Sequence, residues 1–428
     1  METLAYPGVM ETLYREIMPN GLEVVVLPKE GFSKTYATFA TRYGSIDNRF
    51  AVDKGDPISV PDGIAHFLEH KMFEEPTGDI FATFASQGAS ANAFTSFDRT
   101  VYLFSATEQI PANLETLLDF VQHPYFTDEN VEKEKGIIEQ EINMYRDNAD
   151  WRVYFGLIDA LYHVHPIHID IAGTAESIRQ IDKETLYSCY ETFYHPSNMF
   201  LFIVGGVKPL DVMELVRNNQ ARKTFAPQGP IARYFDPEPA SVKQPRKLTA
   251  LPVSQPKCLF GFKEHREPLE PNALLRTELI TKLMLDSLLG SSSPIYHELY
   301  DDNLISDSFG HEFNSSEDYA FSVIGGETRD PDLLIERLRE AIENTQKSGL
   351  NVQSFERTKK KKIGGYLRML NSPEAIASEF TRYRFRGADL FKLLPLYESI
   401  TIEEANKRLR EHFNWDRMAV SIVSKGAK

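Results

Sequence analysis

The same succession of predicted elements, a helix, a turn and an apolar strand, occurs twice in this chain, about half a chain apart. The stretch IDKETLYSCYETFYHPSNMFLFIVGGV has the pattern of a helix, a turn and an apolar strand, and ITIEEANKRLREHFNWDRMAVSIVSKG repeats that pattern. Met199 matches Met418 and Val204 matches Val423, so both pairs are 219 positions apart. Self-similarity at such a long period indicates a duplicated domain rather than a solenoid of short repeats.

The duplication predicts two homologous domains. A chain of 428 residues is also too long for one typical hydrophobic core. We expect an N-terminal domain over residues 1–222 and a C-terminal domain over residues 257–428. Residues 223–256 are rich in proline and have little periodicity, so we expect them to form an extended linker.

Local patterns predict an α+β fold, with a mainly antiparallel sheet covered by helices in each domain. Residues 22–27 and 35–44 are rich in β-branched and aromatic side chains, so we expect them to form paired strands. A helix over 61–73 follows, with Ser59 or Asp62 as its N-cap. In the first half we also expect a helix at 79–87 and strands at 90–94 and 100–106. In the second half we expect strands at 257–262 and 319–326.

Composition excludes several classes of function. The net charge of −15 argues against binding to nucleic acid or to an anionic membrane, because both need a basic surface. Cys189 and Cys258 are the two cysteines, too few for the disulfide framework of a small secreted domain. The N-terminus has no apolar signal segment and no window is long enough to span a membrane, so we expect a cytoplasmic protein.

Two histidines and a glutamate stand on one side of the apolar helix predicted over 61–73. His66 and His70 are four positions apart, and Glu69 lies on the same side. The two imidazoles can converge on one ion while the carboxylate accepts a proton from water. The alternative is an ordinary polar edge on a buried helix. With 11 histidines and 62 acidic residues, chance gives roughly 0.04 or fewer HxxEH strings, which favours the metal site.

A third ligand has two candidate sources. In the glutamate-rich helix expected over 129–148, Glu134 and Glu141 fall on one stripe and Glu139 points to another side. A solvated acidic face is the other interpretation of this charge run. The second source is the stretch YHVHPIHID, and spacing alone does not choose between the two. The possible ligands in that stretch are His163, His165, His168 and Asp170.

Segments along nearly the whole chain resemble the pitrilysin or insulysin class of inverted-motif zinc peptidases, the inverzincins. The chain also resembles the shorter members of this class, such as processing peptidases and their bacterial relatives. It rests on HFLEHKMFE, on the IxxEI element in the glutamate-rich helix, and on NGLEVVVLPK, NAFTSFDRTVY, GTAESI and YHPSNMFLFIVG.

The resemblance implies a role for each residue of the motif. His66, His70 and Glu141 bind one Zn²⁺ per chain, Glu69 acts as general base, and Glu134 supports the site. The stretch YHVHPIHID then becomes a structural loop, and the two domains close like a clamshell around a chamber. The resemblance also implies an edge strand that pairs with an extended peptide substrate by β-augmentation. Its residues are Asn92, Ala93, Phe94 and Thr95.

Two departures from the family pattern concern the second half. Shifting HFLEH by 217 positions gives LMLDS, which has no histidine, so the C-terminal domain lacks the metal motif. Related chains carry an Arg and a Tyr there that bind substrate and polarise the scissile carbonyl. In HELYDDNLISDSFG we place Asn303 and Asp307 at those two positions.

The resemblance therefore implies the zinc-bearing subunit of a two-chain peptidase. We expect a zinc metalloendopeptidase that cleaves short or unstructured peptides together with a homologous Arg/Tyr-bearing subunit. This makes a heterodimer the expected active form, and a homodimer is possible in isolation. The alternative function is a non-catalytic scaffold or core subunit of the same fold.

Overall fold

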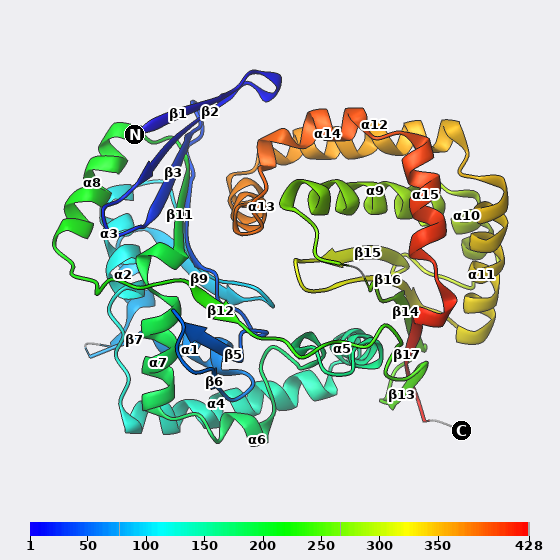
Figure 1. The fold of residues 1–428 in the computed structure, drawn as a ribbon, viewed down its shortest axis with the longest axis horizontal. Coiled ribbons are helices and arrows are strands. Elements are labelled where there is room, and N and C mark those ends of the chain that lie inside the picture. Colours follow the sequence, from blue (N-terminus) through cyan, green and yellow to red (C-terminus); the bar gives the residue numbers. More distant parts are fainter. Residues whose placement is uncertain (77, 266, 427–428) are drawn as a thin grey trace. The chain divides into compact units, whose positions relative to one another are not determined.

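The structure is a computed structural model, and it describes residues 1–76, 78–265 and 267–426 (Figure 1). Its Cα positions divide into two compact units, each built from three separate segments of the chain. Unit 1 consists of Met1–Ile142, Asp170–Phe235 and Arg368–Phe385. Unit 2 consists of Asn143–Ile169, Asp236–Leu367 and Arg386–Lys428.

Unit 1 is built around a seven-stranded sheet with the order β1-β2-β3-β11-β4-β10-β9. All neighbours in it are antiparallel except β3 and β11, which are parallel. Every residue of β4 and β11 is buried, so these central strands carry the core. The strands are β1 Glu2–Tyr6, β2 Glu11–Ile17, β3 Glu23–Pro28, β4 Thr35–Thr41, β9 Ala89–Thr95, β10 Thr100–Ala106 and β11 Met199–Gly205.

Unit 2 is built around a five-stranded sheet that repeats this topology. Its order is β13-β17-β14-β16-β15, and its one parallel pair, β13 and β17, matches β3 and β11. The offset of 219 residues places Met199 of β11 on Met418, the first residue of β17. The duplication predicted from sequence is therefore present in the strand order. The strands are β13 Arg246–Ala250, β14 Lys257–Phe262, β15 Gly310–Ser315, β16 Ala320–Glu327 and β17 Met418–Ser424.

Helices cover both sheets, which gives the predicted α+β class (Figure 1). In unit 1, α3 and α8 lie on one side of the sheet and α13 packs on β4 and β11 from the other side. The helices of the first half are α1 Ile64–Met72, α2 Ile80–Ser86, α3 Ile110–Val121, α4 Asp128–Asp147, α5 Ala149–Leu161, α6 Ala175–Ile178, α7 Lys183–Phe193 and α8 Pro209–Ala221. Those of the second half are α9 Pro271–Leu289, α10 Pro294–Asp301, α11 Pro331–Ser348, α12 Val352–Met369, α13 Pro373–Phe385, α14 Leu393–Ser399 and α15 Ile402–His412.

The two halves of the sequence exchange one helix each. Helix α5 comes from the first half but packs on β13, β14 and β17 of unit 2. Helix α13 comes from the second half but belongs to unit 1, where the Thr381 hydroxyl lies 3.3 Å from the Thr38 hydroxyl of β4. The compact units therefore do not follow the contiguous ranges 1–222 and 257–428, because each sheet buries a helix supplied by the other half of the chain.

Three local expectations need correction. The strands at 22–27 and 35–44 do not pair with each other, because β11 lies between β3 and β4 and bonds to both. The stretch 223–256 is not wholly extended linker, because it contains β12 (Ile231–Arg233), which pairs with β5 (Arg49–Val52), as well as β13. Turn and proline signals mark where strands end, but they do not say which strands become neighbours.

The third correction concerns the start of α1. Its N-cap is Gly63, with φ of 86°, and no side-chain hydrogen bond caps the helix. Asp62 instead accepts a hydrogen bond from Asn48, and Ser59 lies in the short strand β6 (Ile58–Ser59), which pairs with β5. Glycine is required at position 63 because a Cβ there would lie 2.5 Å from the carbonyl oxygen of Ala172.

The remaining short elements lie at turns. They are β7 Glu74–Glu75 and β8 Gly78–Asp79, which pair with each other, and the 3₁₀ turns Pro7–Val9, Pro166–His168, Pro196–Asn198, Leu390–Lys392 and Trp415–Arg417. Among the described residues, no helix combines the length and apolar character needed to cross a membrane.

Candidate metal centre

Helix α1 places the HxxEH residues inside unit 1. It is almost wholly buried, packs against β9, β10 and α7, and presents His66 and Glu69 with less than a tenth of their surface exposed. His70, one turn after His66, is half-buried. The imidazole centroids of the two histidines are 4.5 Å apart, as expected for positions i and i+4 on one helix face.

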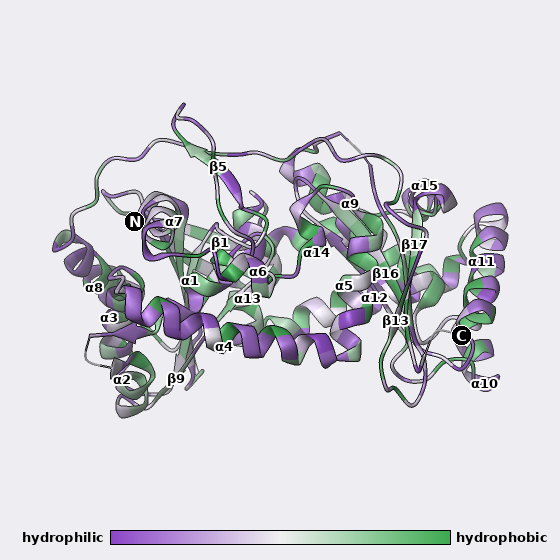
Figure 2. Ribbon diagram, turned by 90° about the horizontal axis from the view of Figure 1, so that it is seen from below, coloured by the Kyte–Doolittle hydropathy of each residue, from purple (hydrophilic) through white to green (hydrophobic). Residues whose placement is uncertain are grey.

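Helix α4 supplies the carboxylates that face α1. Most of this helix is hydrophilic (Figure 2), and its buried stripe includes Glu134, Ile138 and Ile142. The predicted register is confirmed by the contacts: Glu134 and Glu141 reach the histidines of α1, whereas Glu139 forms an ion pair with Arg179 at 2.6 Å.

Three possible ligand atoms converge at this place. One atom each from His66, His70 and Glu141 lies within 4.8 Å of the others. The Nε2 atoms of His66 and His70 are 3.7 and 3.5 Å from Oε2 of Glu141. In the described ranges of the chain this is the one group of three or more His, Cys, Asp or Glu residues with such geometry.

The donor set fits a zinc ion. A tetrahedral zinc with bonds of about 2.0–2.1 Å holds neighbouring ligand atoms roughly 3.3 Å apart, close to the distances from Glu141 to the two histidines. Burial, together with the neighbouring His70, lowers the pKa of His66 to about 4, so its imidazole is neutral, as a metal ligand must be. The buried Nδ1 of His66 has no hydrogen-bond partner among the described residues.

Glu134 orients His70 from outside the ligand set. Its Oε1 lies 3.0 Å from Nδ1 of His70, so Nδ1 carries a proton that it donates to Glu134, and Nε2 is the ring nitrogen that faces Glu141 at 3.5 Å. Burial alone would raise the pKa of Glu134, but the hydrogen bond and charge of His70 outweigh it and the pKa is lowered. Glu134 is therefore an ionised partner of the histidine.

Lys71 is a site residue that the sequence reasoning missed. Its side chain is fully buried, its Nζ forms an ion pair with Glu74, and the same Nζ is 3.8 Å from Oε2 of Glu134. The available signal was a lysine directly after His70 inside the apolar run HFLEHKMF. Such a lysine needs a carboxylate partner if it is buried.

Glu69 is buried on α1 and does not belong to the group of three convergent ligand atoms. Its Oε2 accepts a hydrogen bond of 2.7 Å from the hydroxyl of Thr95, at the end of β9. Burial raises the pKa of Glu69 although the Thr95 hydrogen bond opposes the shift. A buried carboxylate with a raised pKa is a better proton acceptor than an exposed one.

The residues Asn92–Thr95 lie on β9, at the outer edge of the seven-stranded sheet. Within the described residues β9 pairs with β10 alone, so its second edge has no strand beside it. Asn92 is exposed, and its side-chain oxygen accepts the backbone N–H of Ala93 at 2.8 Å. The strand that the sequence analysis linked to substrate therefore ends at Thr95, in contact with Glu69.

The competing stretch YHVHPIHID does not join the candidate site. The backbone N–H groups of His163, Val164 and His165 donate to the carboxylate of Glu238, which also pairs with the buried Lys263. Burial opposes these hydrogen bonds, but together they lower the pKa of Glu238 to about 2. The contacts are those of an ordered loop.

The place corresponding to α1 in unit 2 is taken by α9, which follows β14 and lacks histidine. Asp286, 217 positions after Glu69, pairs with Lys361 at 3.0 Å and with Lys362 at 3.4 Å. Beyond α9, Asn303 adopts a left-handed backbone conformation with φ of 54°, and its amide donates to the carbonyl of Asp301. The left-handed conformation suits asparagine or glycine better than arginine.

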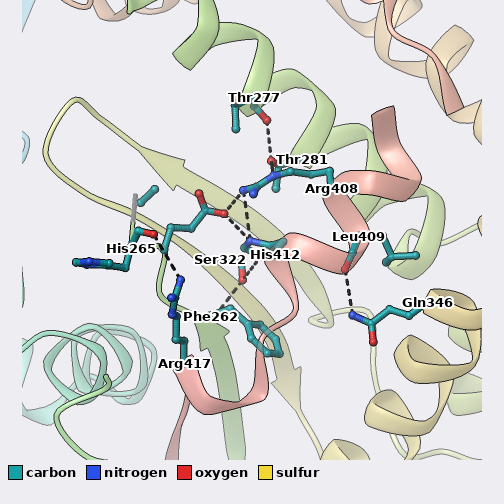
Figure 3. Close-up of polar contacts among 12 residues, drawn as sticks. Phe262, His265, Thr277, Thr281, Ser322, Gln346, Arg408, Leu409, His412 and Arg417 are labelled. Carbon is teal, nitrogen blue, oxygen red and sulfur yellow. Dashed lines mark hydrogen bonds and ion pairs between the residues drawn. The ribbon is translucent and has the colours of Figure 1, made fainter. Parts of the chain in front are cut away.

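A second buried polar network lies in unit 2 (Figure 3). Nδ1 of His412 is 2.7 Å from Oε1 of Glu264, and Nε2 is 2.9 Å from the hydroxyl of Ser322. The order of groups resembles a serine nucleophile, base and acid. Ser322 is completely buried, however, and its hydroxyl accepts the backbone N–H of Phe262 at 3.2 Å, so the network joins β14, β16 and α15 and offers no nucleophile to a substrate.

The two-unit α+β fold is that of known M16-like peptidases. The family model "Insulinase (Peptidase family M16)" matches residues 59–175, and the model "Peptidase M16 inactive domain" matches residues 180–362. The first match contains the HxxEH helix, and the second contains α9, which lacks the motif. The chain belongs to the insulinase family, peptidase family M16.

Three known proteins match almost the whole chain. It is 50% identical over 424 residues to the uncharacterized zinc protease YmfH of Bacillus subtilis, covering 99% of each chain. It is 42% identical to a putative M16-like peptidase from Alicyclobacillus acidocaldarius, whose crystal structure matches with a TM-score of 0.94 over 96% of this chain and 98% of that one. A protease from Helicobacter pylori shares the fold, with a TM-score of 0.84 at 19% identity over 96% of this chain and 99% of that one.

Proposed function

We propose that the protein is a zinc metalloendopeptidase in which His66, His70 and Glu141 hold one zinc ion and Glu69 is the general base. The observation that carries the proposal is the convergence of these three ligand atoms beside a buried carboxylate that does not join them. The names of the relatives as zinc proteases give it further support.

Each residue of the site has a separate task. A zinc ion held here would supply Lewis-acid activation of water and of a peptide carbonyl. Glu69 accepts the proton of the attacking water and later gives it to the leaving amine, while Thr95 holds the carboxylate in place. Glu134 fixes the tautomer of His70.

The substrate in this proposal is a short or unstructured peptide. An extended peptide can add to the open edge of β9, which has no neighbouring strand on that side in the described residues. Because β9 ends at Thr95, such a peptide would run toward Glu69. A folded substrate would first have to release a segment in extended conformation.

The test is the substitution Glu69→Gln. The amide keeps the size of the side chain and cannot accept the proton, so zinc content should stay at one per chain while hydrolysis of a quenched fluorescent peptide is lost. Glu139→Gln is the matched control, because Glu139 faces Arg179 and not the site. Full turnover by Glu69→Gln would overturn the assignment of the base.

We also propose that full activity needs a homologous partner chain that carries an Arg and a Tyr. The support is the stretch HELYDDNLISDSFG, which contains no arginine and has Asn303 in a left-handed turn. A donor to the developing oxyanion is worth about 10²- to 10³-fold in rate. Two copies of this chain could not supply it, so the proposed active form is a heterodimer.

Mixing experiments test the partner. The zinc-loaded chain is assayed alone and with an M16 chain that has the Arg/Tyr pair and lacks HxxEH, and a rise of about 10²-fold or more is expected only on mixing. Turnover by the single chain at about 1 to 10³ per second would contradict the need for a partner.

A non-catalytic scaffold is the competing function, and metal binding separates the two. Zinc removal by a chelator should lower the melting temperature and zinc addition should restore it, because only the folded state brings the three ligands together. A purified chain that contains no zinc and gains no stability from it would favour the scaffold.

A further inference from the structure

The position of helix α1 decides where three residues of the proposed zinc site lie. His66 is the third residue of this helix, and Glu69 and His70 follow about one turn later. The helix has nine residues, so a shift of its start would carry all three side chains with it. The groups that fix the start of α1 therefore bear on the metal centre.

Residues 170–178 pack against the start of α1 through two glycines. Gly63, the N-cap of α1, has φ of 86°, and Gly173 has φ of 74°. A Cβ on Gly63 would lie 2.5 Å from the carbonyl oxygen of Ala172, and a Cβ on Gly173 would lie 2.5 Å from the carbonyl oxygen of Asp62. The contact is reciprocal, because each glycine lets its own backbone approach the backbone of the other segment.

The hydroxyl of Ser177 adds a hydrogen bond to this contact. Its Oγ accepts the backbone N–H of Thr174 at 2.9 Å, as the capping box of α6 requires. Its proton remains for a second partner, and the carbonyl oxygen of Asp62 at 2.8 Å is closer than that of Thr174 at 3.1 Å. Asp62 precedes the N-cap of α1, so this bond joins α6 to the start of the HxxEH helix.

The start of α1 depends on this contact from outside the helix. No side-chain hydrogen bond caps α1, and the carboxylate of Asp62 is engaged by Asn48 at 2.9 Å. The other end of α1 is held by the buried Lys71, which pairs with Glu74 and lies 3.8 Å from Oε2 of Glu134 on α4. Helix α1 is thus held at both ends, at its start by residues 170–178.

The following part of the chain also contacts α4, the helix that supplies Glu141. Arg179 pairs with Glu139 at 2.6 Å, and Lys183 pairs with Asp128 at 2.9 Å. These pairs are largely exposed, and an exposed ion pair contributes little to stability by itself. The contacts with α1 are made by buried backbone and a half-buried hydroxyl, so they have the larger effect on the metal centre.

We propose that Gly173 and Ser177 are positioning residues of the metal centre. They fix the start of α1, and through it the placement of the ring nitrogens of His66 and His70 relative to Glu141. The inference rests on the proposed zinc site and extends it to a segment that contributes no ligand.

Zinc affinity and the visible absorption spectrum of the cobalt-substituted protein test this role, because the spectrum of bound Co²⁺ reports the geometry of its ligands. Ser177→Ala should weaken zinc binding about tenfold and change the cobalt spectrum. Asp182→Ala is the matched control, since Asp182 is an exposed N-cap whose side chain caps α7 and not α1. Its melting temperature should fall by a similar amount. Its zinc affinity and cobalt spectrum should stay those of the parent.

Gly173→Ala disturbs the same contact by pushing the two segments apart. The added Cβ would meet the carbonyl oxygen of Asp62, so zinc affinity should again fall about tenfold or more, with a changed cobalt spectrum. Gly31→Ala is the control for backbone strain, because Gly31 has a similar φ of 80° and nothing within 4 Å of its added Cβ. If Gly173→Ala does not fold, Ser177→Ala decides alone.

The inference is overturned if Ser177→Ala, or a folded Gly173→Ala, keeps the zinc affinity and cobalt spectrum of the parent. A lower melting temperature with an unchanged spectrum would show a merely structural role and would also overturn it, as would equal losses of zinc affinity in the controls. A parent protein that binds neither metal would overturn the proposed zinc site and this inference with it. Failure of the inference alone is therefore distinguishable from failure of the proposed function.

Discussion

The hydroxyl of Thr95 donates a hydrogen bond of 2.7 Å to Oε2 of Glu69, and it thereby joins the last residue of the edge strand β9 to the HxxEH helix α1. The strand proposed to align the substrate is thus hydrogen-bonded to the proposed general base. Movement of β9 would therefore reposition the carboxylate.

We expect Thr95→Val to lower kcat about tenfold without changing zinc content, because valine keeps the shape of threonine and removes the hydroxyl that donates this hydrogen bond. Steady-state kinetics and metal analysis on the same preparation check this. Ser90→Ala on the exposed side of β9 is the control. An unchanged kcat would mean that Glu69 is held by other groups.

Glu141→Gln should weaken zinc affinity by more than about a hundredfold, whereas Glu139→Gln should leave it unchanged. Glu141 reaches both histidines, and Glu139 pairs with Arg179 on another side of α4. Competition with a chromophoric chelator measures both affinities. Equal losses of zinc affinity in the two variants would contradict the assignment of Glu141, and not Glu139, to the side of α4 that faces the metal.

Lys71→Met should destabilise the protein by about 3 kcal/mol, because removal of one partner from a buried ion pair leaves the other charge uncompensated. Glu134 would lose its neighbouring ammonium, so zinc affinity should also fall about tenfold. Urea unfolding and chelator competition measure the two effects. The control is Lys54→Met, at an exposed lysine after β5, and equal behaviour of both variants would contradict the assigned role of Lys71.

Acid should destabilise unit 2 through His412. Burial, followed by the charge of Arg408, places the pKa of this histidine well below its ordinary value. The unfolded chain takes up a proton near pH 6.5 and the folded chain does not, so the contribution of His412 to stability is complete above pH 6.5 and is lost below it. The loss approaches about 1.4 kcal/mol per pH unit.

Urea unfolding at pH 7.5 and 5.5 measures this dependence. His412→Gln should reduce the loss between the two pH values, and His123→Gln, at an exposed position, should not. His66 and His165, whose pKa values are also lowered to about 4, stay in both variants, so the comparison isolates His412. Identical pH dependence in all three proteins would contradict the prediction.

Much of the candidate site was predictable because it depends on helical periodicity. The spacing of His66, Glu69 and His70 places them together on any helix, and the stripe of Glu134 and Glu141 follows from the same period. The sequence could not show that α4 packs against α1, and the resemblance to known peptidases was needed to choose Glu141 over the histidines at 163–168.

The sequence by itself determined the α+β class, the duplication and the helix faces, because apolar periodicity and repeated order are local properties that survive in any arrangement of the elements. Only the tertiary structure decided that β11 lies between β3 and β4, that α5 and α13 are exchanged, and that Lys71 is buried against a carboxylate. It also decided that Thr95 bonds to Glu69. Each of these contacts joins two elements that are distant in the sequence. The pattern of each element predicts that one of its faces is buried, but it does not predict which other element packs against that face.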